Sequence, residues 1–244
     1  MTRRGTGGAE PLVLLPGMNC SARLWASLDL SDDHPLITPA LTEPTMSGQV
    51  KRLIEQLPER FGLIGLSLGA IVAMALARLS PDSVTRLCLM STNPHAPTKQ
   101  QRTAWTRQRA QLAAGRTARD LQRDLLPALL SRTVIDEQPA IVEQTLLMAD
   151  DVGRVDLDAQ LSLQGTRIDE RPALAELTCP TLVIAAREDL LCSVDRHVEL
   201  SRLITGSTLV VVDQAAHLSP LERPGELSRA IRDWLSGPPA TPRQ

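Results

Sequence analysis

The chain has 244 residues, of which 43% are hydrophobic and 22% charged; this suits one sizeable folded domain and excludes wholesale disorder. The formal net charge is −2 and only 2% of residues are aromatic, so a basic surface and a base-stacking platform for nucleic acid are both excluded. The four scattered cysteines include no C-x-x-C pair, which argues against a structural zinc site and favours free thiols in a reducing cytoplasm.

The first third of the chain alternates short apolar runs with helical patterns. Strands are predicted at residues 12–15, around 36–38, at 63–66 and at 84–90. Helices are predicted at residues 46–57 and 70–79. Residues 61–77 carry no charge, but their glycines favour a buried strand, a tight turn and a buried helix over a membrane span. No membrane partner is therefore expected.

The pattern changes in the middle of the chain. Residues 97–165 show no strand signal and are expected to form three or four helices, broken near Gly115, Pro127, Pro139 and Gly153. Strands return at residues 181–186 and 208–212, a last helix is predicted at 225–235, and the Pro-rich tail 237–244 is expected to be disordered. This order predicts an α/β fold, a mostly parallel sheet flanked by helices, with an inserted helical segment.

A G-x-S-x-G pattern, Gly65-Leu66-Ser67-Leu68-Gly69, stands between a predicted strand and a predicted helix. The chain must turn sharply here, and small residues two before and two after the serine keep the backbones apart. The hydroxyl is then presented at the helix N-terminus, where the helix dipole favours developing negative charge. We predict Ser67 as a nucleophile; a serine that caps a buried helix is the alternative.

A serine nucleophile needs a base, and the chain has only four histidines. His217 follows the predicted strand 208–212 by a short loop, which puts it at the carboxyl edge of the sheet with Ser67. His197 lies in a helical pattern with charged neighbours and is expected on the surface, whereas His34 and His95 lie near turns. His217 is therefore the predicted base.

The base needs an orienting carboxylate, which is expected just after the strand at residues 181–186. Asp189 is our assignment, with Glu188 and Asp213 as rivals, because sequence alone does not separate the directions of adjacent side chains. The resulting chain order is nucleophile, acid, base.

A tetrahedral intermediate would also need two backbone N–H donors. One is expected from Leu68, directly after the nucleophile, and the other from the turn Pro16-Gly17-Met18. Met18 is the predicted donor in that turn and Asn19 the alternative. The competing interpretation is that Gly17 simply makes a turn.

Taken together, these motifs resemble the α/β-hydrolase fold superfamily over nearly the whole chain. The likeness rests on residues 12–18, 65–69, 178–189 and 216–224. It implies a hydrolase core formed by residues 1–94 and 171–244, a helical cap at residues 95–170, and an active site between them. Trp25 is a candidate to line the pocket, with core packing as the alternative. The chain departs from many relatives at Pro16-Gly17, where they have His-Gly.

The resemblance also implies cleavage of a small-molecule carboxylic ester through an acyl-enzyme on Ser67, with no metal or organic cofactor. Enol-lactone hydrolysis, hydrolytic cleavage of carbon–carbon bonds and perhydrolysis are alternatives that keep the same three residues. A binding protein without catalysis and an interfacial lipase are alternatives of other kinds. A monomer or homodimer in the cytoplasm is expected, with a small-molecule ester as its substrate.

Overall fold

The computed structural model describes residues 10–30 and 34–239, and its central feature is a parallel sheet. Its strands are β1 (Leu12–Leu15), β2 (Leu36–Ile37), β3 (Phe61–Leu66), β4 (Val84–Met90), β5 (Thr181–Ala186) and β6 (Thr208–Val212). Their order across the sheet is β2-β1-β3-β4-β5-β6, and every neighbouring pair is parallel. The predicted α/β fold class is confirmed.

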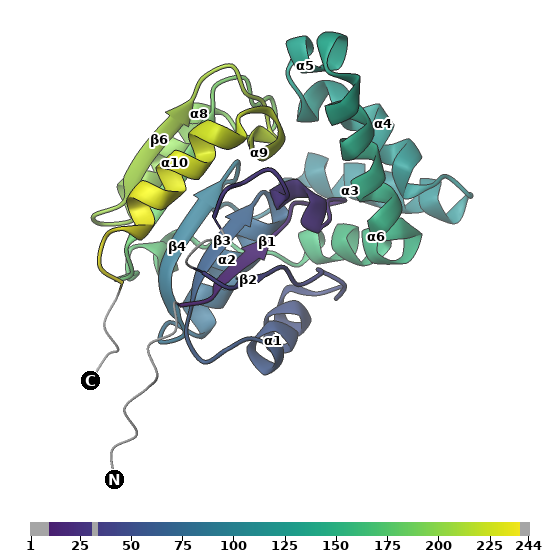
Figure 1. Ribbon diagram of the computed structural model, residues 1–244. Coiled ribbons are helices and arrows are strands. Elements are labelled where there is room, and N and C mark those ends of the chain that lie inside the picture. The colour runs from purple at the N-terminus through teal and green to yellow at the C-terminus, as the bar shows by residue number, and fades with distance from the viewer. Residues whose placement is uncertain (1–9, 31–33, 240–244) are drawn as a thin grey trace.

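Helices cover both faces of this sheet, as Figure 1 shows. One face packs against α1 (Met46–Gln56), α2 (Leu68–Leu79) and α8 (Val194–Leu203). The other packs against the short helices η1 (Ala22–Trp25) and α9 (Ser219–Glu222) and against α10 (Pro224–Leu235). The inner strands β3, β4 and β5 are buried along their whole length, which explains why they appear in the sequence as continuous apolar runs.

The helical stretch between β4 and β5 forms a separate layer. It contains α3 (Lys99–Ala113), α4 (Ala118–Leu129), α5 (Arg132–Glu137) and α6 (Pro139–Gly165), and the short α7 (Arg171–Leu174) follows. Buried side chains of α3, α4 and α6 pack on one another in a small core of their own. In Figure 1 this layer lies beyond the carboxyl ends of the strands.

The expected breaks in this layer are correct except at one proline. Gly115 separates α3 from α4, and Gly153 adopts a φ of 69° at a kink inside α6. Pro127, however, lies within the last turn of α4, and the helix continues to Leu129. A proline there removes only one backbone hydrogen bond, close to the helix end, while apolar side chains of α4 stay packed in the layer's core.

Two further expectations concern the ends of elements and of the chain. Helix α2 begins at Leu68, directly after Ser67 and two residues earlier than predicted. Residues 240–244, which make up most of the tail expected to be disordered, lie outside the described residues. Among the residues that are described, no helix has both the length and the apolar character to cross a membrane.

Candidate active site

Ser67 occupies a strained turn between β3 and α2. Its backbone angles are φ 54° and ψ −114°, and few non-glycine residues adopt a positive φ. A Cβ on Gly65 would lie 2.6 Å from the backbone of Ala70, and a Cβ on Gly69 would overlap the carbonyl oxygen of Leu15. Both glycines of the G-x-S-x-G pattern are therefore required by close backbone approach, and the serine side chain stands at the start of a helix.

A network of hydrogen bonds from the end of β4 holds this turn in place. The backbone N–H of Ser67 donates to the carbonyl oxygen of Met90 (2.9 Å), and Thr92 Oγ1 donates to the carbonyl oxygen of Ser67 (3.3 Å). The N–H of Thr92 in turn donates to Nε2 of His197 (3.0 Å). The loop after β4 thus connects α8 to the candidate nucleophile.

The expectation that His197 lies on the surface was wrong. Its side chain is fully buried, with Nδ1 donating to the carbonyl oxygen of Ser193 (3.0 Å) while Nε2 accepts from Thr92. Burial lowers the pKa of His197. The charged residues Arg196 and Glu199 that suggested a surface position lie on the outer side of α8, whereas His197 and Leu200 lie on the buried side.

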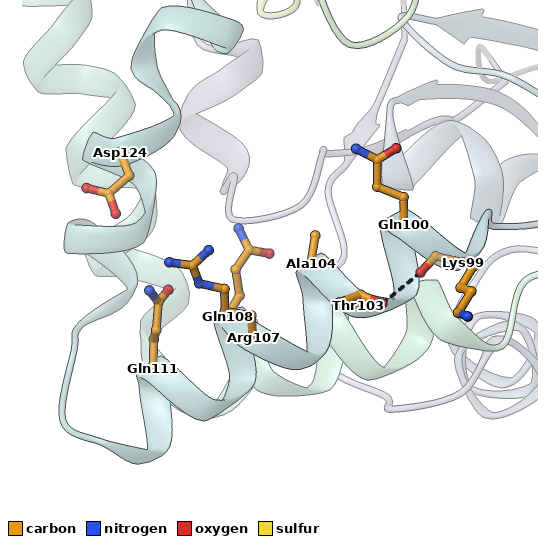
Figure 2. A pocket seen from close by; sticks show the side chains of 8 residues that line it. All are labelled: Lys99, Gln100, Thr103, Ala104, Arg107, Gln108, Gln111 and Asp124. Atoms are coloured by element: carbon orange, nitrogen blue, oxygen red, sulfur yellow. Dashed lines mark hydrogen bonds between the residues drawn. The ribbon is translucent and has the colours of Figure 1, made fainter.

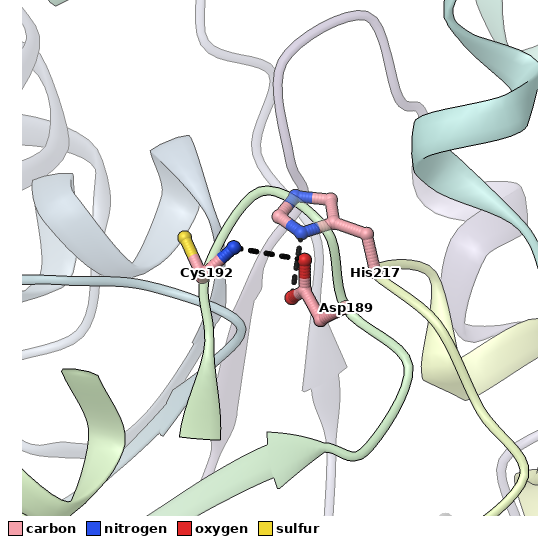
Figure 3. Close-up of side chains that lie close together, drawn as sticks. All are labelled: Asp189, Cys192 and His217. Atoms are coloured by element: carbon pink, nitrogen blue, oxygen red, sulfur yellow. Dashed lines mark hydrogen bonds and ion pairs between the residues drawn. The ribbon is translucent and has the colours of Figure 1, made fainter. Parts of the chain in front are cut away.

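His217 and Asp189 form a buried pair at the carboxyl edge of the sheet (Figure 3). His217 Nδ1 and Asp189 Oδ2 are 2.9 Å apart, and Oδ1 accepts from the backbone N–H groups of Leu191 (2.8 Å) and Cys192 (2.9 Å). Burial alone would raise the pKa of Asp189, but His217 and the hydrogen bonds outweigh it and the net shift is downward. The carboxylate is therefore ionised at neutral pH.

The two rival carboxylates do not share this position. Glu188 is exposed, and Asp213 pairs with Arg187 (2.9 Å). The loop that carries His217 is instead supported by Glu222, a residue that our sequence analysis did not single out. Its buried carboxylate accepts from the N–H groups of Ala216 (3.0 Å) and Ser131 (2.7 Å), and burial raises its pKa. Its place after the histidine in the motif at residues 216–224 was the available signal.

The turn after β1 is fastened to the helical layer by Asn19, which has a φ of 58°. The backbone N–H of Asn19 donates to Gln160 Oε1 (2.8 Å), and its side-chain amide donates to Gln122 Oε1 (2.9 Å) and to the carbonyl oxygen of Ala118 (3.0 Å). Because its N–H is engaged, Asn19 is a poor candidate for an oxyanion donor. In the described part of the chain, no hydrogen bond engages the N–H of Met18 or of Leu68.

Ser67 and His217 line the same cavity, which has a volume of about 270 Å³. Its wall combines the turn after β1, including Gly17 and Met18, with side chains of α3, α4 and α6. Trp25, a candidate for this wall, is not part of it. The structure places its side chain among buried residues such as Leu24 and Leu28, under the sheet face covered by α10.

A wide, open groove lies outside this cavity along α3 (Figure 2). It is lined by polar and charged side chains that include Lys99, Arg107 and Asp124. Ala104 and Gln108 line both the groove and the cavity. Helix α3 is therefore a thin wall between solvent and the candidate active site.

Asp189, Cys192 and His217 also offer ligand atoms within 4.8 Å of one another. In Figure 3 the backbone nitrogen of Cys192, rather than its sulfur, faces the carboxylate. Burial raises the pKa of the Cys192 thiol to about 12. The carboxylate is already held by three hydrogen bonds, and the set does not fit a metal site.

Comparison with known proteins places the chain among hydrolases. It is 25% identical to the biotin biosynthesis bifunctional protein of Cellvibrio japonicus, over 91% of this chain but 47% of that protein. It is 24% identical to the pimeloyl-[acyl-carrier protein] methyl ester esterase of Aliivibrio fischeri, over 94% of this chain and 95% of that one. A solved structure of a thermophilic esterase from Thermogutta terrifontis aligns with a TM-score of 0.85, 24% identity and coverage of 95% and 91%.

A family model adds the broadest match. The model described as "Alpha/beta hydrolase family" matches residues 12–230, which span the sheet, the helical layer and the candidate active site. The fold and the order of its elements agree with this assignment, and the chain belongs to the alpha/beta hydrolase family.

Proposed function

We propose that the protein is a serine hydrolase that cleaves a carboxylic ester of a small molecule through an acyl-enzyme on Ser67. The observation that carries this proposal is the buried Asp189–His217 pair, whose histidine lines the same cavity as a serine on a strained strand-to-helix turn. The name of the Aliivibrio relative, a methyl ester esterase, supports the same reaction type.

In the proposed reaction, His217 removes the proton from Ser67 as the serine oxygen attacks the ester carbonyl. Because Nδ1 is paired with Asp189, Nε2 is the nitrogen left to take this proton. Asp189 fixes the tautomer and stabilises the imidazolium that forms. His217 then protonates the leaving alcohol, and water activated by the same histidine releases the acid. This route uses the chain's own groups without a cofactor.

The negative charge that develops on the carbonyl oxygen needs donors in place before the reaction. We assign this role to the backbone N–H groups of Met18 and Leu68. Leu68 begins α2, so its N–H lies at the positive end of the helix dipole. The engagement of the Asn19 N–H by Gln160 favours Met18 over Asn19. Loss of one such donor typically raises the barrier by roughly 3 kcal/mol.

We further propose that residues 95–170 act as a cap over a core of residues 1–94 and 171–244. The helices of this segment pack on one another and supply part of the cavity wall, which supports the division. A monomer or homodimer acting in the cytoplasm fits the four cysteines of the described structure, which are not joined in disulfides. The substrate is a small-molecule ester, with neither nucleic acid nor membrane as a partner.

The test is turnover of short-chain p-nitrophenyl esters beside enol lactones and carbon–carbon ring-fission substrates. We expect ester turnover by the purified protein and its loss in Ser67→Ala. The matched control is Ser80→Ala, at the other end of α2, where the hydroxyl forms a hydrogen bond with that of Ser83 (3.0 Å). If a lactone or carbon–carbon substrate is turned over efficiently while esters are inert, the same three residues would catalyse that alternative reaction instead. Unchanged turnover in Ser67→Ala would reject the proposal.

A further inference from the structure

A buried arginine in the cavity wall has no anionic partner among residues 10–30 and 34–239. Arg167 follows α6 in the chain, is only 6% exposed and lines the cavity with Ser67 and His217. Its Nη1 donates to Gln164 Oε1 (3.3 Å) and its Nη2 to Gln101 Oε1 (3.2 Å). The guanidinium lies 5.5 Å from the centre of the Trp105 ring. All three neighbours are neutral.

The acidic side chains that follow Arg167 in the chain form ion pairs with other arginines. Glu170 pairs with Arg78 (2.7 Å), and Asp169 pairs with Arg171 (2.5 Å). Within the described part of the chain, no carboxylate comes within ion-pair distance of Arg167, and its buried Nε has no hydrogen-bond partner. Arg102, whose charge acts on Arg167, is another cation.

The electrostatic environment makes this arrangement costly for the protein alone. Burial lowers the pKa of Arg167, and the charge of Arg102 acts in the same direction. Cys192 also lies close, but burial raises the pKa of its thiol to about 12, so it supplies no negative charge at neutral pH. A buried cation without a counter-charge is strongly unfavourable, so an arginine in this position is typical of a site that receives an anion.

We propose that Arg167 binds a carboxylate on the substrate, so that the ester cleaved at Ser67 belongs to a molecule with a free acid group. The planar guanidinium presents paired donors that match a carboxylate, and in the described structure its Nε has no hydrogen-bond partner. The amides of Gln101 and Gln164 hold the guanidinium without neutralising it. This inference rests on the proposed ester hydrolysis and identifies the substrate class for the same cavity.

The rest of the cavity suits such a molecule. Apolar side chains, among them Met18, Ile71 and Leu125, share the cavity with Ser67 and Arg167. They are suited to a short hydrocarbon chain that carries the ester at one end and the carboxylate at the other. A volume of about 270 Å³ matches a small molecule of this kind. The half-ester of a straight-chain diacid is the simplest compound with this chemistry.

The experiment compares two methyl esters with the purified full chain: the monomethyl ester of a diacid, and the methyl ester of the corresponding monoamide. The two have nearly the same shape, and only the first carries a charge. We expect kcat/KM for the acid to exceed that for the amide by about 10- to 100-fold, the usual range for a charge-assisted hydrogen bond. A series of chain lengths locates the best spacing, and a ratio near one at every length overturns the inference.

Two variants assign the preference to a residue. In Arg167→Gln the acid-to-amide ratio should fall toward one, whereas in Arg107→Gln it should stay at the wild-type value. Arg107 is exposed in the outer groove and does not line the cavity, so both changes remove one positive charge but only one removes it from the cavity. A wild-type ratio retained in Arg167→Gln overturns the inference.

Binding measurements test the anion site independently, even if Arg167→Gln does not fold or the proposed reaction fails. The free diacid should compete with the substrate, or bind by calorimetry, at least about tenfold more tightly than its diamide. If neither ester is hydrolysed but the diacid binds with this preference, the proposed function fails while the anion site stands. If the esters are hydrolysed but no assay shows a preference for the acid, the proposed function stands and the anion site fails.

Discussion

The two edges of the sheet differ in backbone strain and in the pairing of buried charge. All four non-glycine residues with positive φ among those described follow the carboxyl end of a strand: Asn19 after β1, Ser67 after β3, Ser91 after β4 and Gln214 after β6. At the amino edge, strands enter the sheet through regular hydrogen bonds, such as that from the N–H of Leu12 to the carbonyl oxygen of Pro35 (2.9 Å). Strain of this kind collects where a site must be held in place.

The two buried arginines repeat the contrast. Arg86, near the start of β4, lies 3.6 Å from the carboxylate of Glu10 and donates to the carbonyl oxygens of Trp234 (3.3 Å) and Leu235 (2.8 Å). Arg167, at the carboxyl edge, has only neutral partners. The two side chains are equally buried, but among the described residues only Arg86 has a carboxylate within ion-pair distance.

The largest effect is expected at Asp189. Asp189→Asn should lower kcat by about 10⁴-fold, because the amide supports the wrong tautomer of His217. Glu188→Gln, the adjacent exposed carboxylate, should leave ester turnover close to wild type. Steady-state kinetics on one ester measures both variants. The reverse ranking would assign the orienting carboxylate to Glu188 and would mean that the buried Asp189–His217 pair is not part of the catalytic machinery.

The two arginines should also differ in what they contribute to stability. Arg86→Met should lower the free energy of unfolding by about 2–3 kcal/mol, because Glu10 and two carbonyl groups lose their partner. Arg167→Met should leave it unchanged or raise it, because the change removes a buried cation that has no counter-charge. Urea denaturation of the two variants gives both values. Equal losses would mean that Arg167 is a structural residue like Arg86.

Backbone strain at the carboxyl edge predicts a smaller effect. Ser91 has a φ of 46°, and its buried hydroxyl has no hydrogen-bond partner in the described structure. Ser91→Gly should therefore stabilise the protein by about 0.5–1 kcal/mol. Ser47→Gly, at an exposed position in the first turn of α1, should destabilise it by about 0.5 kcal/mol. Destabilisation by both changes in thermal or urea unfolding would argue against stored strain.

The smallest effect concerns pH. The pKa of His197 is lowered by burial from its ordinary value of 6.5, so as pH falls below that value the unfolded chain takes up a proton that the folded protein resists. The free energy of unfolding should therefore decrease from pH 7.5 to pH 5.5, and the decrease should be shallower in His197→Gln. Asp189, with a pKa below its ordinary 3.8, titrates outside this window. If the free energy of unfolding decreases equally with falling pH in wild type and in His197→Gln, His197 is not the cause of the decrease.

Sequence reasoning works best where an apolar run is bounded by turn residues. Strands β1, β4, β5 and β6 have the predicted bounds, because apolar runs between turn residues leave little freedom. It also anticipated which strand ends carry Ser67, Asp189 and His217, since parallel strands share one carboxyl edge. Their catalytic roles remain predictions.

The failures of the sequence analysis are contacts between distant segments. The burial of His197 depends on the loop after β4, which lies about a hundred residues earlier in the chain. Trp25 packs in the core, the alternative that the sequence left open, and does not line the cavity. No local pattern encodes the contact that buries His197.

Labelling with a fluorophosphonate, followed by peptide mass spectrometry, tests the central claim most directly. The account predicts a single covalent adduct on Ser67, absent in Ser67→Ala and much slower to form in His217→Ala. An intact, folded protein that is not labelled, or that carries the adduct on a different serine, would contradict it.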